Sequence, residues 1–121
     1  MLPDSKISQL ISLQIPGLTY VMWQYRVSGP LYEVIHVFAD YTKRMIRGGQ
    51  LSEAKKCFTI AGVLYRNGSG LLRNAIESVY LYGLSPLLDT ADAAFGNRPV
   101  KTLLPVVLQQ ARIEQLNNGT I

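Results

Sequence analysis

The residues best suited to chemistry surround the only histidine of the chain. His36 follows Glu33 by three positions and precedes Asp40 by four, and these spacings place all three side chains along one face of a helix. A Glu-x-x-His pair can ligate a metal in helical bundles, but such sites also need further carboxylates and a second motif from facing helices. The chain has no second histidine. We therefore interpret this group as a solvated face with a local hydrogen bond or charge pair, and we expect no metal site.

The single cysteine, Cys57, is the other candidate for reactivity. Lys55 and Lys56 precede it and would lower the pKa of an exposed thiol. A cysteine beside Phe58 on a core-facing stripe usually behaves as a small hydrophobe, and we prefer that interpretation. The sequence contains no glycine-rich phosphate loop, nucleophile elbow or zinc-protease motif. We accordingly predict no catalytic residue, no cofactor and no enzymatic activity.

Length and composition indicate one globular domain. The chain has 121 residues, 48% of them hydrophobic and 17% charged, which is ordinary for a protein that buries its own core. Its N-terminus places Pro3, Asp4 and Lys6 before any apolar run, and no apolar run approaches the ~18 residues that a membrane span requires. We expect a cytoplasmic protein without membrane association.

The basic balance is compatible with several partners. The net charge of +4 comes from 12 basic and 8 acidic residues, which fits a nucleic acid, an acidic protein or a plain soluble surface. The basic residues are spread along the chain, which favours the plain surface. Lys43, Arg44 and Arg47 lie in the last turn of a predicted helix, where cations interact favourably with the macrodipole.

The element around which the rest is expected to pack is the helix over residues 71–82. Its sequence, LLRNAIESVYLY, has four polar residues at i, i+1, i+4 and i+5, which leave one narrow solvent-facing stripe. The remaining positions cover most of the helix circumference and must be covered by neighbours. This helix is predicted to end near Gly83. The apolar positions predicted to be buried are Leu71, Leu72, Ala75, Ile76, Val79, Tyr80, Leu81 and Tyr82.

Five further helical segments are predicted from apolar residues at steps of three and four, bounded by proline, glycine and asparagine. Two of them have clear patterns, one terminated by Gly48-Gly49 and one that runs to Arg66 and is broken by Asn67-Gly68-Ser69-Gly70. The last carries Pro105 either as a kink or in its true first turn. The expected ranges are 5–14, 30–47, 50–66, 85–95 and 99–116. Short connections imply antiparallel or steeply crossing neighbours.

Residues 18–27 fit two patterns. Alternation of Val21, Trp23, Tyr25 and Val27 is typical of a strand, whereas Leu18, Val21, Met22 and Tyr25 fit a helical turn. A lone strand would have no partner elsewhere, so a short helix or an extended arm is preferred. The fold class is therefore all-α, a compact single-domain array of five to six helices over residues 1–121. Residues 1–28 supply a first helix and an aromatic arm, and residues 29–116 supply the helical core.

Half of the chain resembles a known family. The run FADYTKRMIRGGQLSEAKKCF from Phe38, the run NGSGLLRNAIESVYLYGL to Leu84, and LLPVVLQQ at 103–110 are similar to small helical bacterial proteins of unknown function that are suspected to act as immunity proteins in toxin systems. The shared positions are Phe38-Ala39, Thr42, Gly49, Lys55-Lys56-Cys57-Phe58, Asn74-Ala75-Ile76 and Leu104-Pro105. They are mostly scaffold positions, so the resemblance implies a fold and a possible toxin partner, and it implies no catalytic residues.

The sequence therefore predicts a non-enzymatic protein-interaction module. Immunity-type proteins are often acidic, because many toxins that they neutralise are basic nucleases, and this chain is basic. A nucleic-acid-associated or regulatory helical protein is the alternative, and self-association into a homo-oligomer is compatible with the apolar helices. Aromatic and arginine side chains are the usual anchors of protein interfaces. The candidate partner contacts are Tyr20, Trp23, Tyr25, Tyr32, Arg44 and Tyr82.

Overall fold

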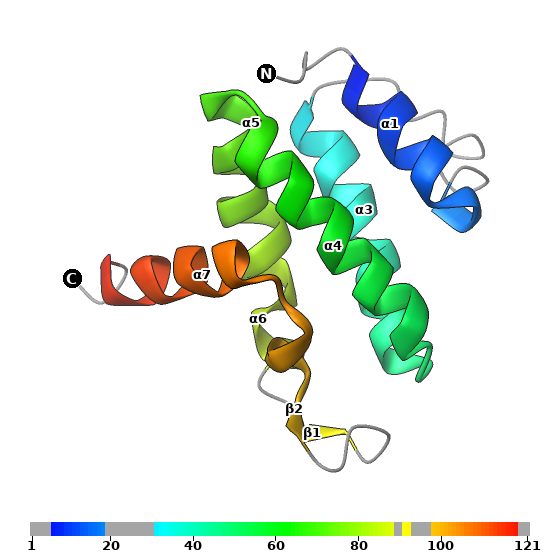
Figure 1. Ribbon diagram of the computed structural model, residues 1–121, viewed down its shortest axis with the longest axis vertical. Coiled ribbons are helices and arrows are strands. Elements are labelled where there is room, and N and C mark those ends of the chain that lie inside the picture. The colour runs from blue at the N-terminus through cyan, green and yellow to red at the C-terminus, as the bar shows by residue number, and fades with distance from the viewer. Residues whose placement is uncertain (1–5, 19–30, 89–90, 93–97, 119–121) are drawn as a thin grey trace.

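The computed structural model is an all-α domain and describes residues 6–18, 31–88, 91–92 and 98–118 (Figure 1). Helix α1 spans Ile7–Gln14, α3 spans Leu31–Arg47 and α4 spans Leu51–Asn67. The central helix consists of α5 (Gly70–Ala75), the π-helical segment η2 (Ile76–Leu81) and α6 (Tyr82–Leu88) in direct succession. The short 3-10 helix η4 (Val100–Leu103) precedes the last helix, α7 (Val106–Asn118).

The core lies where α3, α4 and the central helix pack against one another, as the short loops predicted. Helix α1 packs on α3, and α7 packs on α4 and η2 (Figure 1). Phe38 of α3 and Tyr80 of η2 are both fully buried, with ring centroids 4.8 Å apart. Burying side chains of this size contributes about 1.5–3 kcal/mol each, so the contact between α3 and η2 is a main source of stability.

The turn between α3 and α4 explains why both helices were predicted within a residue or two of their observed bounds. Gly49 has a φ of +73°, the left-handed conformation that glycine adopts without a steric penalty. The amide of Gly49 donates to the carbonyl of Ile46, and the amide of Gln50 donates to the carbonyl of Met45. These are the two bonds of a Schellman motif, which ends a helix by satisfying its last carbonyls.

The expected end of the central helix at Gly83, followed by a separate helix over residues 85–95, is wrong. The helix continues through Gly83 to Leu88, because Leu84 and Leu88 are fully buried and extend its apolar stripe. Their burial outweighs the low helix propensity of one glycine and one proline in the last turns. Residues 91–92 are extended and pair antiparallel with residues 98–99, so this part of the predicted helix is absent. The paired segments are β1 (Ala91–Asp92) and β2 (Arg98–Pro99).

The expected burial of the central helix is confirmed for most positions and wrong for two. Leu71 is 50% exposed and Tyr82 is 71% exposed, whereas Leu72, Ala75 and Tyr80 are fully buried. Neighbouring helices therefore cover less of the circumference than the apolar pattern predicted. The predicted polar stripe does face solvent, with Arg73, Asn74 and Ser78 exposed and Glu77 half-buried.

The first and last helices each start later than expected. Helix α1 starts at Ile7 and ends at Gln14, and residues 16–18 are helical again, so Pro16-Gly17 stops α1 without ending helical structure. The last helix was expected near Pro99 but starts at Val106, because residues 100–103 form the 3-10 helix η4. The carbonyl of Pro105 accepts bonds from the amides of Leu108 and Gln109, so Pro105 opens α7 and does not kink it. Among the described helices, none has both the length and the apolar character to cross a membrane.

Candidate functional site

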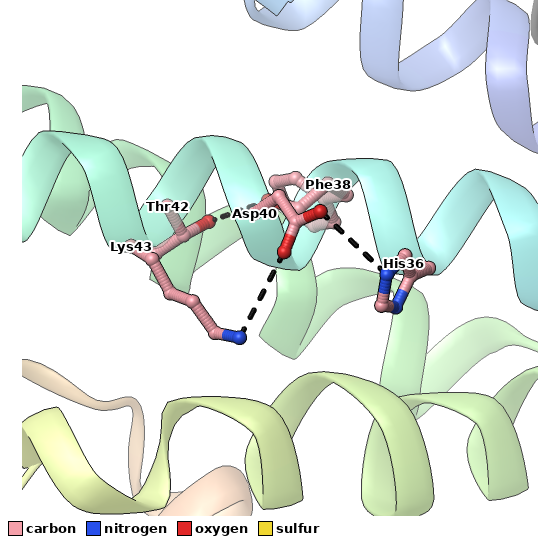
Figure 2. Close-up of polar contacts among 5 residues, drawn as sticks. All are labelled: His36, Phe38, Asp40, Thr42 and Lys43. Carbon is pink, nitrogen blue, oxygen red and sulfur yellow. Dashed lines mark hydrogen bonds and ion pairs between the residues drawn. The ribbon is translucent and has the colours of Figure 1, made fainter.

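His36, Asp40 and Lys43 lie along one side of α3 (Figure 2). The distance from His36 Nε2 to Asp40 Oδ2 is 3.6 Å, and that from Lys43 Nζ to Asp40 Oδ1 is 3.7 Å. The side chain of His36 is 67% exposed, and Glu33 is also exposed. In the described part of the chain, no group of three His, Cys, Asp or Glu residues is placed to hold a metal ion. The exposure of His36 and Glu33 and the charge-pair contacts of Asp40 agree with the preferred interpretation, a solvated face with a local charge pair.

Cys57 lies inside the core and is not placed for nucleophilic chemistry. Burial raises the pKa of its thiol from 9.0 to about 11, and Glu53 adds to the rise, while the Thr42 hydroxyl and Lys56 oppose it. The thiol is therefore protonated at neutral pH, and a protonated thiol is a poor nucleophile. The structure agrees with a small hydrophobic side chain at this position.

A buried polar pair locks α3 to η2. The Thr42 hydroxyl donates to the carbonyl of Phe38 at 2.9 Å, and the same oxygen lies 3.0 Å from the Tyr80 hydroxyl. A carbonyl can only accept, so the single hydroxyl hydrogen of Thr42 is used there, and Tyr80 must donate to Thr42. Burial raises the pKa of Tyr80 well above its ordinary value, so the phenol stays protonated. This pair positions the two helices whose outer sides form the candidate site.

The outer sides of α3 and the central helix form one continuous face. The side-chain amide of Asn74 donates to the hydroxyl of Tyr32 at one end. At the other end, the ammonium of Lys43 lies beside Gly83, where an added Cβ would be 3.6 Å from Nζ. From the first pair, Tyr32 and Asn74, to the second, Lys43 and Gly83, the residue number increases along both helices. Helix α3 and the central helix therefore run parallel. We call this surface the α3–α6 face, and its residues are Tyr32, His36, Asp40 and Lys43 from α3 and Asn74, Ser78 and Tyr82 from the central helix.

The π segment keeps the central-helix residues of this face in line. Positions four apart drift around an α-helix in one direction, because its turn has fewer than four residues. A π turn is wider and has i→i+5 bonds, so four residues fall short of one turn there. The helix from Asn74 through Ser78 to Tyr82 contains both kinds of turn. The rotation of side-chain direction in the α-helical part is opposite to that in the π-helical part, so these three residues stay on one side of the helix. The Ser78 hydroxyl also donates to the carbonyl of Asn74 at 2.6 Å.

The predicted partner contacts divide into two groups. Tyr20, Trp23 and Tyr25 lie outside the described residues, and so does most of the segment whose helical or extended form was left open. Tyr32 is half-buried on the α3–α6 face, and Tyr82 is 71% exposed at the other end of the same face. Arg44 is exposed near the end of α3. Two of the six predicted residues therefore belong to the α3–α6 face, at its opposite ends.

Sequence reasoning did not include Lys43, Arg47 or Asn74 among the contacts. Lys43 and Arg47 were explained by the helix dipole, and Asn74 was assigned to a generic polar stripe. These residues can be grouped only when α3 and the central helix are known to run side by side. That arrangement is a tertiary feature, and no local sequence pattern indicates it.

Two hollows in the described surface lie away from this face. One, of about 210 Å³, is on the outer side of α1. The other, of about 190 Å³, lies between η4 and α7, and its wall includes the buried Arg112. Neither hollow is lined by a sequence-predicted site residue. The second is lined by Lys101, Thr102, Leu104, Gln109, Arg112 and Ile113.

Comparison with protein families decides the classification of the chain. Residues 8–118 match the model of a domain of unknown function, DUF7674. The chain belongs to this family. Membership confirms the predicted relation to a family of unknown function, and the family description contains no statement about toxins. Comparisons with curated proteins and with solved structures found no match.

Proposed function

We propose that the chain is a non-enzymatic protein-interaction module of the cytoplasm, that it binds through the α3–α6 face, and that its partner is a toxin which it neutralises. The observation that carries the proposal is the 71% exposure of Tyr82, on a helix whose other large side chains are mostly buried. Tyrosine gives a large contact area at a low cost in side-chain entropy, and it is enriched among the residues that dominate interface energetics.

The surroundings of Tyr82 support a protein partner. The face combines two tyrosines with an amide, a hydroxyl and side chains of both charges, which is the mixed composition of a protein interface. The helices beneath it are held by the Phe38 and Tyr80 rings and by the Thr42–Tyr80 bond. A rigid platform reduces the entropy lost on binding, so more of the contact energy is available for affinity.

Toxin neutralisation is supported by the resemblance of residues 38–84 and 103–110 to suspected immunity proteins. The net charge of +4 argues that the partner presents an acidic surface, in contrast to the basic nucleases that acidic immunity proteins bind. The competing function is nucleic-acid association. It is favoured by Lys55, Lys56 and Arg66, which are all exposed on α4.

The test is affinity capture with the tagged chain from a lysate of the source organism, with and without nuclease. We expect one stoichiometric protein to be recovered by the wild type after nuclease treatment, and to be lost with Tyr82→Ala. Val106→Ala is the control, because Val106 is 73% exposed at the start of α7, away from the α3–α6 face. Recovery of nucleic acid alone before treatment, and of nothing afterwards, would favour the competing function.

Self-association is measured in the same preparation by light scattering after size-exclusion chromatography. A dimer that dissociates with Tyr82→Ala would make a second copy of this chain the occupant of the face. That result would exclude the toxin as the ligand of this surface.

A further inference from the structure

The last two turns of α3 carry cations that the fold does not use. Arg44 and Arg47 are both exposed, and the structure shows no ion pair for either among the described residues. Lys43 differs, because it is half-buried and lies 3.7 Å from a carboxylate oxygen of Asp40. The two guanidinium groups are therefore available to a ligand.

Capping of the helix end does not require these arginines. The carbonyls of Arg44, Met45 and Ile46 already accept bonds from the backbone amides of Gly48, Gln50 and Gly49, respectively. The interaction with the helix dipole that remains is weak for an exposed cation, because salt and solvent screen it. That interaction is compatible with binding, because attraction to the helix dipole takes up no hydrogen-bond donor of either guanidinium group.

An exposed aromatic ring belongs to α6, the helix that Lys43 approaches. Lys43 approaches Gly83 of α6, and Gly83 directly follows Tyr82. Arg47 lies one turn beyond Lys43 on the same side of α3, since residues four apart on a helix are neighbours. The end of α3 and the start of α6 thus present two arginines that form no ion pair with another described residue, a lysine, and a tyrosine that is 71% exposed.

We propose that the C-terminal end of α3, beside the α3–α6 face, docks an acidic segment of the partner protein, with Arg44 and Arg47 pairing carboxylates and Tyr82 covering an apolar side chain between them. Arginine binds carboxylates through two parallel hydrogen bonds, which fixes the orientation of the segment as well as attracting it. The inference rests on the proposed function and adds the chemistry of the partner.

The distribution of charge favours a short acidic segment over nucleic acid. Asp40 and Glu33 lie on the outer side of α3 toward its N-terminus, so the cationic stretch is limited to the last two turns. A phosphate chain that continued along the helix would meet these carboxylates.

The test uses fluorescence anisotropy with a labelled peptide of alternating glutamate and leucine, and with a glutamine-leucine peptide and a labelled oligothymidylate as comparison probes. The variants are Arg44→Gln/Arg47→Gln and Tyr82→Ala. The matched control is Lys55→Gln/Lys56→Gln, which removes the same charge from exposed positions of α4. Circular dichroism checks that each variant keeps its helical content.

We expect the acidic peptide to bind the wild type more tightly than either comparison probe. The arginine double variant should bind it about tenfold more weakly, and the lysine double variant less than about twofold, because only the arginines pair directly with carboxylates. Tyr82→Ala should also weaken binding.

Equal losses in the two double variants would overturn the inference, because they would show attraction by net charge alone. Tighter binding of oligothymidylate than of the acidic peptide, or no binding of the acidic peptide to the wild type, would also overturn it. These results leave the proposed function standing if lysate capture still yields a protein that depends on Tyr82. Failure of that capture removes the proposed function itself.

Discussion

Replacing Thr42 by valine should destabilise the fold more than its small chemical change suggests. The substitution removes the hydroxyl that accepts from Tyr80 at 3.0 Å, inside a fully buried environment. The Tyr80 hydroxyl then has no acceptor at this position, and an unsatisfied buried donor costs about 1–3 kcal/mol. The carbonyl of Phe38 loses only an additional donor, since it lies within α3, where it also accepts a backbone bond.

The partner substitution, Tyr80→Phe, should cost less. It removes one hydrogen bond, worth about 0.5–1.5 kcal/mol, and leaves Thr42 still donating to Phe38. The double variant removes both hydroxyls, so no buried donor is left without an acceptor. Its loss of unfolding free energy should be smaller than the sum of the two single losses by about 1 kcal/mol. The contact between Thr42 and Cys57 is lost equally in the single Thr42 variant and in the double variant. It therefore cancels from the coupling energy of the double-mutant cycle.

The assay is urea unfolding of the four proteins, followed by far-ultraviolet circular dichroism under two-state analysis. Thermal melts give an independent check, since 1 kcal/mol corresponds to about 4 °C or somewhat more at this chain length. Losses that add without coupling would refute the assignment of Tyr80 as donor to Thr42. A Thr42→Val variant as stable as the wild type would refute the claim that this pair locks α3 to η2.

Three further outcomes can be measured with the same unfolding assay. Gly68→Ala should lose about 1–3 kcal/mol, because an added Cβ would lie 2.6 Å from the carbonyl oxygen of Leu64; an unchanged urea midpoint would contradict this close approach. Ser69→Ala should lose about 1 kcal/mol, since the Ser69 hydroxyl caps α5 by accepting from an amide of its first turn at 3.1 Å. Stability should fall as pH rises above about 9, because the unfolded chain releases the Cys57 proton near 9.0 and tyrosine protons near 10.0, whereas burial raises the folded pKa of Cys57 to about 11 and raises that of Tyr80 well above its ordinary value. A pH titration of the urea midpoint in which Tyr80→Phe and wild type decline identically would reject the contribution of Tyr80.

The helical segments were predictable where local signals agreed with one another. Apolar positions at steps of three and four, together with Gly48-Gly49 and Asn67, placed α3 and α4 within a residue or two of their observed bounds. The inward positions of α3, among them Ile35, Phe38 and Ile46, are buried as the pattern indicated. In these helices, periodicity and termination point to the same structure, so no tertiary information was needed.

The candidate site was less predictable, because it depends on which helices run side by side. Local propensity at Gly83 and Pro86 favoured a break, but burial of Leu84 and Leu88 continued the helix. The π segment, which keeps Asn74 and Tyr82 on one face, has no recognisable signal in the sequence. Tyr80 lies within this segment and packs against Phe38 of α3, which is far away along the chain.

The amino-acid sequence by itself determined the all-α class, the main helical core and the membership of an uncharacterised family, because periodicity, chain termination and family pattern are local or linear properties. Tertiary structure alone decided that Tyr82 is exposed, that the pKa of the Cys57 thiol is raised to about 11, and that two parallel helices share one polar face. Exposure and electrostatics depend on what lies across the core from a residue, and one helix seen in isolation contains no information about its neighbours.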